Sequence, residues 1–250
     1  MTSALNRREF MEIWGGPSAL IGLDPKYSSG PIFVAEQFLL ENGKQLERLH
    51  LYLRDALLPA LAAETKGRRF VLEAIVSAHQ PQVLFLHEFE SVEAWRAVTQ
   101  SLSANKELLA AHEAFDRETP YHVRNLSLYA ATNYNPHAVD LSGKHIFELR
   151  VYQAPSVWQA NGLHERFEGP EIPIFHRCGI HPALYLSGIA GAQLPNLTYL
   201  TPFASLAARE AAWSQFQADP EWHAVRQHSI DQHGYTPRII NISLYKPAPY

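Results

Sequence analysis

The feature that most constrains the fold of this chain is an internal repeat. Residues of the first half recur in the second half at a constant distance of 114 positions, without a gap from residue 32 to about residue 110. Because a constant offset over so long a stretch is not expected by chance, we interpret the chain as two copies of one unit. The clearest matches are Ile32-Phe33 with Ile146-Phe147, Leu49-His50 with Leu163-His164, Pro59 with Pro173, and Phe89-x-Ser91 with Phe203-x-Ser205.

Each copy shows the same order of predicted elements. A strand with alternating apolar and polar residues (33–40 and 147–153) precedes a helix, two short strands, a helical region in two pieces and a last strand. This order, β-α-β-β-α-β, is the ferredoxin-like pattern. We therefore expect an α+β fold of two ferredoxin-like units, at residues 32–135 and 146–250, joined by a polar linker at 136–145.

Local signals mark where the helices begin and end. Ser91 and Ser205 each stand before a helical pattern as N-caps, and Asp219-Pro220 has the cap and first-turn residues of a helix start. The first helix of copy one carries leucines at helical spacing from 46 to 61. Pro59 lies late in that pattern and is expected to kink or end the helix.

The packing of the two units follows from their sheets. Helices cover one face of each ferredoxin-like sheet. The other face would expose apolar side chains to water unless it is buried. The simplest solution places the two sheets face to face in one barrel with helices outside. The strand at 147–153 would then turn one set of side chains to the helices, Phe147, Leu149 and Val151, and the other set to the barrel interior, Glu148, Arg150 and Tyr152.

The second copy also resembles the NIPSNAP family, a branch of the dimeric α+β barrel superfamily. The matching pieces are Glu148-Leu149-Arg150-x-Tyr152, Pro173 with Phe175-His176 and Gly179, Asn196-Leu197-x-Tyr199-Leu200, Phe203-x-Ser205-Leu206-x-x-Arg209, and Asp219-Pro220-x-Trp222. The resemblance implies this barrel fold and a tandem arrangement, but it implies no settled reaction. The wider superfamily contains cofactor-free oxygenases and isomerases, so these are the reaction classes that the resemblance implies.

Composition excludes several classes of function. The net charge of −4 gives no basic footprint for nucleic acid, and no apolar run reaches the roughly 20 residues needed to span a bilayer. A single cysteine, Cys178, rules out an internal disulfide and a multi-cysteine metal site. The sequence has no nucleotide-binding glycine motif and no His-x-x-x-His pair. We expect neither a cofactor nor a metal ion.

The first 31 residues allow two interpretations. Arg7-Arg8 followed by Glu9-Phe10-Met11 is similar to a twin-arginine export motif, but no Ala-x-Ala cleavage site follows. The other interpretation is an N-terminal arm, which we favour. We accordingly expect a cytoplasmic protein, with the periplasm as the alternative.

The first candidate site lies on the strand at 147–153. Arg150, Glu148 and Tyr152 are expected to face the barrel interior, where charged groups must be paired or solvated. The repeat aligns Arg150 with Glu36, which suggests an ion pair across the interior that fixes how the halves dock. The alternative is a pocket in which the forked guanidinium of Arg150 binds an anionic or carbonyl-bearing ligand.

Histidines supply further candidates. His50 and His164 are equivalent by the repeat, and either could act as an acid or base, although a structural role is the simpler interpretation. His176 and His181 flank a polar stretch that we place near the rim of a pocket. Three glutamates spaced by three residues, Glu165, Glu168 and Glu171, would form a solvated face if the segment is helical, which Gly169-Pro170 makes doubtful.

Two functional hypotheses follow. In the first, the protein binds a small organic molecule in or at the rim of the barrel, through Glu36, Glu148, Arg150, Tyr152 and His181. An enzyme of this kind would use Arg150 to orient the substrate, Tyr152 for a hydrogen bond, and His164 or His176 to move a proton. In the second, the barrel interior is filled by side chains, and the chain is a non-enzymatic module that binds a protein partner or a second copy of itself.

Overall fold

A closed antiparallel barrel of eight strands lies at the centre of the computed structural model, which describes residues 24–118 and 120–250. The strand order is β1-β3-β2-β8-β5-β7-β6-β4. The first unit supplies β1 (Ile32–Leu39), β2 (Arg69–Val76), β3 (Gln82–Phe89) and β4 (Val123–Ala131), and the second supplies β5 (Ile146–Gln153), β6 (Leu184–Ala190), β7 (Asn196–Phe203) and β8 (Ile239–Pro247). The units join where β2 pairs with β8 and β4 with β6. The prediction of two ferredoxin-like units in one barrel is confirmed.

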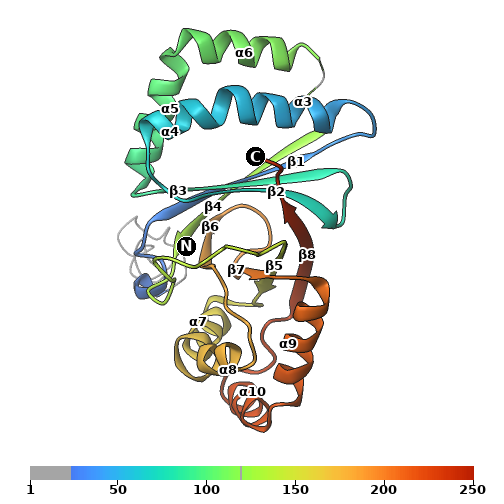
Figure 1. Ribbon diagram of the computed structural model, residues 1–250. Helices are drawn as coiled ribbons and strands as arrows, with labels where there is room; N and C mark the ends of the chain where they lie inside the picture. Colours follow the sequence, from blue (N-terminus) through green and yellow to red (C-terminus); the bar gives the residue numbers. More distant parts are fainter. Residues whose placement is uncertain (1–23, 119) are drawn as a thin grey trace, which may run out of the picture.

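The helices of the two units lie on opposite sides of the barrel (Figure 1). The first unit has α3 (Gln45–Tyr52), a π-helical turn (Leu53–Leu57), α4 (Leu58–Glu64), α5 (Val92–Ala104) and α6 (Lys106–Asp116). The second has α7 (Val157–Arg166), a π-helical turn (Phe167–Glu171), α8 (Ile172–Arg177), α9 (Leu206–Ala218) and α10 (Pro220–His233). A short 3-10 helix (Pro25–Tyr27) precedes β1. Within the described ranges, no helix has the length and apolar character that a membrane crossing requires.

The predicted helix starts are confirmed. The Oγ atoms of Ser91 and Ser205 accept hydrogen bonds of 3.1 Å from backbone N–H groups in the first turns of α5 and α9. The Asp219 carboxylate accepts one of 3.0 Å from the backbone of Trp222 at the start of α10. Each cap satisfies a backbone donor that a helix N-terminus leaves without a partner.

The helical segment of the first unit does not end at Pro59, because α3 continues through a π-helical turn directly into α4. Pro59 is the second residue of α4, directly after the π-helical turn, so the irregular turn and the proline occur together within one continuous segment. The second unit repeats this irregularity between α7 and α8, where Gly169 has non-helical backbone angles beside Pro170. Proline and glycine here mark a widened turn inside a longer helical segment.

The prediction of which face of β5 meets the helices is wrong. Phe147 and Leu149 belong to an apolar cluster inside the barrel, to which strands of both units contribute. Glu148, Arg150 and Tyr152 instead face the helices of the second unit. A closed barrel interior offers no water to these charges, whereas α9 supplies a guanidinium and an indole ring for them to contact. The buried barrel cluster contains Phe33, Ala35, Phe70, Leu72, Leu84, Leu86, Ala131, Phe147, Leu149, Ala183, Leu184, Leu186, Leu200 and Tyr245.

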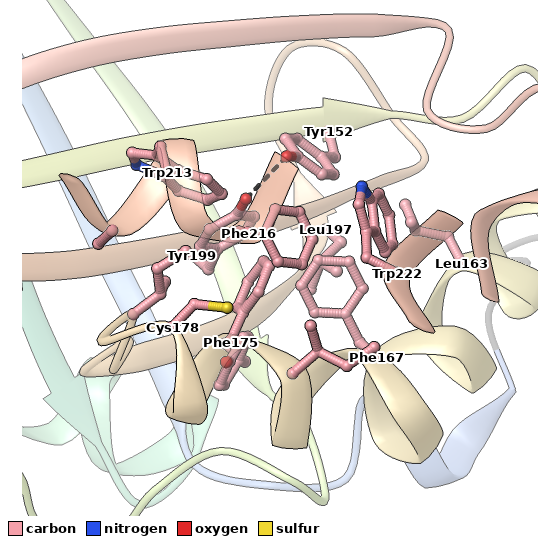
Figure 2. Close-up of a cluster of buried hydrophobic side chains, with 14 of the residues drawn as sticks. Tyr152, Leu163, Phe167, Phe175, Cys178, Leu197, Tyr199, Trp213, Phe216 and Trp222 are labelled. Atoms are coloured by element: carbon pink, nitrogen blue, oxygen red, sulfur yellow. Dashed lines mark hydrogen bonds between the residues drawn. The ribbon is translucent and has the colours of Figure 1, made fainter. Parts of the chain in front are cut away.

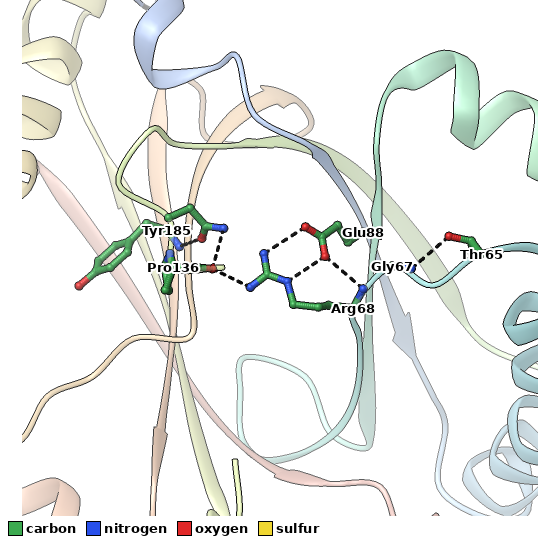
Figure 3. Close-up of polar contacts among 7 residues, drawn as sticks. Thr65, Gly67, Arg68, Glu88, Pro136 and Tyr185 are labelled. Atoms are coloured by element: carbon green, nitrogen blue, oxygen red, sulfur yellow. Dashed lines mark hydrogen bonds and ion pairs between the residues drawn. The ribbon is translucent and has the colours of Figure 1, made fainter. Parts of the chain in front are cut away.

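A polar contact ties the start of the linker to both units (Figure 3). Arg68, at the entry to β2, forms an ion pair with Glu88 and donates a hydrogen bond of 2.9 Å to the carbonyl of Pro136. The neighbouring Asn135 side chain accepts a hydrogen bond of 2.7 Å from the backbone N–H of Tyr185 on β6. The linker is therefore fixed at the seam between the units. The arginine pair at residues 7–8 lies outside the described residues.

Burial of the shared interior predicts that Leu149→Ala destabilises the whole molecule. Leu149 is 8% exposed inside the barrel, and a buried leucine truncated to alanine costs about 2–5 kcal/mol. Urea unfolding followed by circular dichroism measures this loss. Leu109→Ala, the same change at a 43% exposed position on α6, is the matched control and should shift stability by less than about 0.5 kcal/mol. Equal effects of the two substitutions would contradict the placement of Leu149.

Candidate functional site

A cavity of about 420 Å³ lies between the sheet and the helices of the second unit. Its floor comes from β5 and its walls from α7, α9 and α10, and β8 contributes to its edge. This volume is in the range of small-molecule sites. The lining residues are Arg150, Tyr152, Arg166, Glu171, Trp213, Phe216, Gln217, Trp222, His223, Arg226, Ile230, Tyr235, Thr236, Pro237 and Ile240.

Arg150 is held in a fixed position on the cavity floor. Its guanidinium lies 3.5 Å from the centre of the Trp213 ring, which is a cation–π contact. It also donates a hydrogen bond of 3.2 Å to the Tyr152 hydroxyl, and its Nε binds Glu148. The sequence identified Arg150 and Tyr152 as neighbours in one site, and the structure brings both to the cavity.

The hydroxyl of Tyr152 is oriented by two donors. It accepts hydrogen bonds from Arg150 and, at 2.8 Å, from the hydroxyl of Tyr199 (Figure 2). Since its oxygen serves two donors, its own proton is left to be donated to another acceptor. Tyr152 is thus placed as a hydrogen-bond donor at the cavity floor.

Glu148 binds Arg150 from behind the cavity wall. It is fully buried and binds both Arg150 and Arg209 of α9, and Arg209 also reaches the exposed Glu210. The predicted pair between Glu36 and Arg150 is wrong, because Glu36 binds Arg124 of its own unit at 2.6 Å. These two glutamates lie on the helix-facing sides of different sheets, so the packed barrel separates Glu36 from Arg150.

Arg166 and Glu171 form a second buried pair that the sequence analysis missed. The Nε of Arg166 donates a hydrogen bond of 2.6 Å to Glu171, and another of its nitrogens donates one of 3.0 Å to the carbonyl of Thr236. Burial raises the pKa of Glu171, and the Arg166 guanidinium offsets part of this rise. The expected solvated glutamate face is wrong for Glu171, which the π-helical turn at 167–171 brings into the core.

The repeat contained a signal for this pair. At the 114-residue offset, Arg166 and Glu171 correspond to Tyr52 and Leu57 of the first copy. A carboxylate that replaces a leucine in an otherwise equivalent helical segment indicates a buried ion pair. Arg226, at the exposed edge of the cavity, corresponds to His112 and gave no comparable signal.

His164 lies outside the cavity lining and has a full set of partners. It is fully buried and stacks on Tyr27 at 4.6 Å between ring centroids. The Ser187 hydroxyl gives its proton to the Tyr27 carbonyl, so His164 Nε2 must donate to Ser187, at 3.2 Å. Its Nδ1 then accepts from the Tyr134 hydroxyl, at 2.6 Å. Burial lowers the pKa of His164 to about 3, so the ring is neutral at pH 7.

The other predicted site residues also lie away from the cavity. His176 and His181 are exposed and stack on each other, with 5.0 Å between ring centroids. His50 contacts the hydroxyl of Tyr250 at 2.9 Å in the first unit. Cys178 is buried, and burial raises the pKa of its thiol. The structure brings Arg150 and Tyr152 together in the cavity, with Glu148 behind them, but it does not add His164, His176, His181 or Glu36 to this group.

The shared position of Glu148 predicts that Glu148→Gln is strongly destabilising. The substitution keeps the shape of the side chain but leaves two arginines without their buried carboxylate, at a cost of about 3–5 kcal/mol. Chemical unfolding gives the difference from the wild-type protein. Glu210→Gln removes the exposed partner of Arg209 and should change stability little. A neutral effect of Glu148→Gln would show that the arginines find other partners.

The burial of His164 predicts acid sensitivity. The pKa of this ring is about 3 in the folded chain and near 6.5 when unfolded, so the unfolded state binds the proton first. The free energy of unfolding should therefore fall as the pH drops below about 6.5, by up to about 1.4 kcal/mol per pH unit from this group. Unfolding series at pH 7, 6, 5 and 4 on the wild-type protein and His164→Gln measure this slope. The same slope in both proteins would exclude His164 as its source.

Solved structures share this fold at low sequence identity. A candidate monooxygenase from Lactobacillus acidophilus aligns with a TM-score of 0.58 and 11% identity, covering 87% of this chain and 94% of the other. An anthrone oxidase-like protein gives 0.57 and 13%, covering 88% and 92%. A second candidate monooxygenase, from Fusobacterium nucleatum, gives 0.56 and 10%, covering 87% and 92%. At these identities the likeness shows the α+β barrel fold alone.

The sequence comparisons concern the second unit. No curated protein matches the chain. The NIPSNAP family model matches residues 147–243, which run from β5 into β8 and contain every residue that lines the cavity. The second ferredoxin-like unit of this chain is therefore a NIPSNAP domain.

Proposed function

We propose that the NIPSNAP unit binds a small organic anion in the cavity between β5 and the helices α7, α9 and α10. The observation that carries this proposal is the charge of the lining. Three arginines line the cavity; Arg166 is paired with Glu171 and Arg150 with Glu148 behind the wall, so the charge of Arg226 is the one left for a ligand. Arg226 has no ion-pair partner among the residues that the structure describes.

The donors of the cavity fit a carboxylate, an enolate or a phenolate. The Tyr152 hydroxyl has its own proton to donate, and the Arg150 guanidinium lies beside it on the cavity floor. Arginine binds such oxygens with two parallel N–H groups. A ligand that reaches from the Arg226 edge to the floor would place its negative charge near these donors.

The aromatic walls fit a flat organic body. Trp213, Phe216 and Trp222 line the cavity, and all three side chains are largely buried. Aromatic rings favour stacked or edge-to-face contacts with another ring. An aromatic carboxylate therefore combines the two properties that this lining favours.

The barrel interior does not take part in this proposal. Apolar side chains of both units pack together there. The cavity of this proposal lies on the helix side of the sheet instead. Proton transfer is the chemistry that the lining could add to binding, since Glu171 is a buried carboxyl group with a raised pKa. An isomerase moves a proton on its substrate, and Glu171 lines the cavity where it could do so, whereas His164 and His176 do not.

The test is a calorimetric titration of the protein with 2-naphthoate. We expect saturable binding that weakens as the salt concentration rises, because salt screens the attraction between the carboxylate and the arginines. Arg226→Gln should weaken binding about ten-fold, equal to about 1.4 kcal/mol. Since Arg226 is exposed, this variant should fold normally.

The matched control is Arg96→Gln, which removes an exposed arginine from α5 of the first unit and should leave binding unchanged. The neutral alcohol 2-naphthalenemethanol serves as the matched ligand, and Arg226→Gln should leave its binding unchanged because the alcohol carries no charge for this arginine to attract. The proposal fails if the wild-type protein does not bind 2-naphthoate, or if Arg226→Gln binds 2-naphthoate as tightly as the wild-type protein and Arg96→Gln do.

A further inference from the structure

A second cavity, of about 220 Å³, lies between the sheet and the helices of the first unit. The repeat relates it to the cavity of the NIPSNAP unit, because Glu36, Phe38 and Tyr52 here correspond to Arg150, Tyr152 and Arg166 there. The two cavities thus occupy the same place in the two copies. Their linings differ in chemical character.

The lining of the first cavity is dominated by aromatic and apolar side chains. Phe85, Phe89, Trp95 and Phe115 are among its walls. Its one arginine, Arg124, binds Glu36 at 2.6 Å, so the two charges compensate each other. Such a lining favours a neutral ligand, in contrast to the arginine-lined cavity of the second unit.

One buried polar group in this wall has no partner. His87, on β3, is 3% exposed, and its Nε2 makes no hydrogen bond among the described residues. Its ring packs against Phe89 at 4.1 Å and Phe85 at 5.8 Å between centroids. Burial lowers its pKa to about 4, so the ring is neutral at pH 7 and can donate or accept one hydrogen bond at each nitrogen. A buried polar atom without a partner costs free energy that a new hydrogen bond recovers, and a ligand in the cavity reaches this closed nitrogen when a neighbouring ring moves aside.

We propose that the first unit holds a separate site for a small neutral aromatic molecule with one hydroxyl or carbonyl group, which hydrogen-bonds to His87. The size of the cavity fits this ligand. An apolar cavity of about 150 Å³ binds benzene, so 220 Å³ has room for a somewhat larger molecule of one or two rings. The proposal rests on His87 and its cavity, and it does not depend on the anion site of the second unit.

The test compares 1-naphthol with naphthalene, which differ by the one hydroxyl group. Calorimetric titration of the full-length protein at pH 7 should show that 1-naphthol binds about ten-fold more tightly. His87→Phe keeps a ring of similar shape and removes the hydrogen-bonding nitrogens. It should abolish the preference, so that both compounds bind with the affinity of naphthalene. A preference that persists in His87→Phe would overturn the proposal.

Two further variants locate the binding. Leu102→Trp places a larger side chain in the cavity wall and should abolish binding of both compounds. Glu210→Gln, at an exposed position of the other unit outside both cavities, should leave both affinities unchanged. Thermal unfolding of each variant without ligand checks that it is folded. The proposal would also be overturned if the wild-type protein did not bind 1-naphthol, or if folded Leu102→Trp still bound it. These two outcomes test the proposal even if His87→Phe does not fold.

Discussion

The apolar contact between the two sheets is the constraint on which the rest of this structure depends. Each ferredoxin-like unit covers only one face of its sheet with helices, and the other face is buried only because the second unit closes the barrel. The seams at β2–β8 and β4–β6 then pair strand edges that would otherwise be open to other chains. Neither unit has a complete core without its partner, so folding of the two halves must be closely coupled.

Closing the barrel in this way determines where function can lie. The interior is packed with side chains of both copies, and the two cavities that the repeat relates lie in the layer between each sheet and its helices. Charged residues follow the same division. Arg150 and Glu148 lie in the layer beneath α9, where Arg209 and Trp213 contact them, and not among the leucines of the barrel.

The order of elements and the barrel could be predicted from the sequence. The repeat shows as a constant offset of 114 residues, and the helix starts show as N-cap residues, so both are visible without the structure. The period of two in β5 correctly separated Phe147 and Leu149 from Glu148 and Arg150, but the same pattern fits either orientation of the strand. Which face of β5 lies inside the barrel depends on the side chains that the helices present to the other face. Those contacts form only in the folded structure. Similarly, no local pattern shows that the π-helical turn brings Glu171 into the core beside Arg166, although Gly169-Pro170 signalled an irregular segment.

The covalent linker, which Arg68 contacts at Pro136, affects how the sequence of such a barrel can evolve. In a barrel built from two identical chains, every substitution occurs twice, and both cavities must carry the same lining. Here a substitution occurs once, and the copy that it leaves untouched still supplies its half of the barrel. Duplication within one chain has therefore released the two halves from symmetry, which allowed an arginine-lined cavity and an aromatic cavity to arise in one molecule.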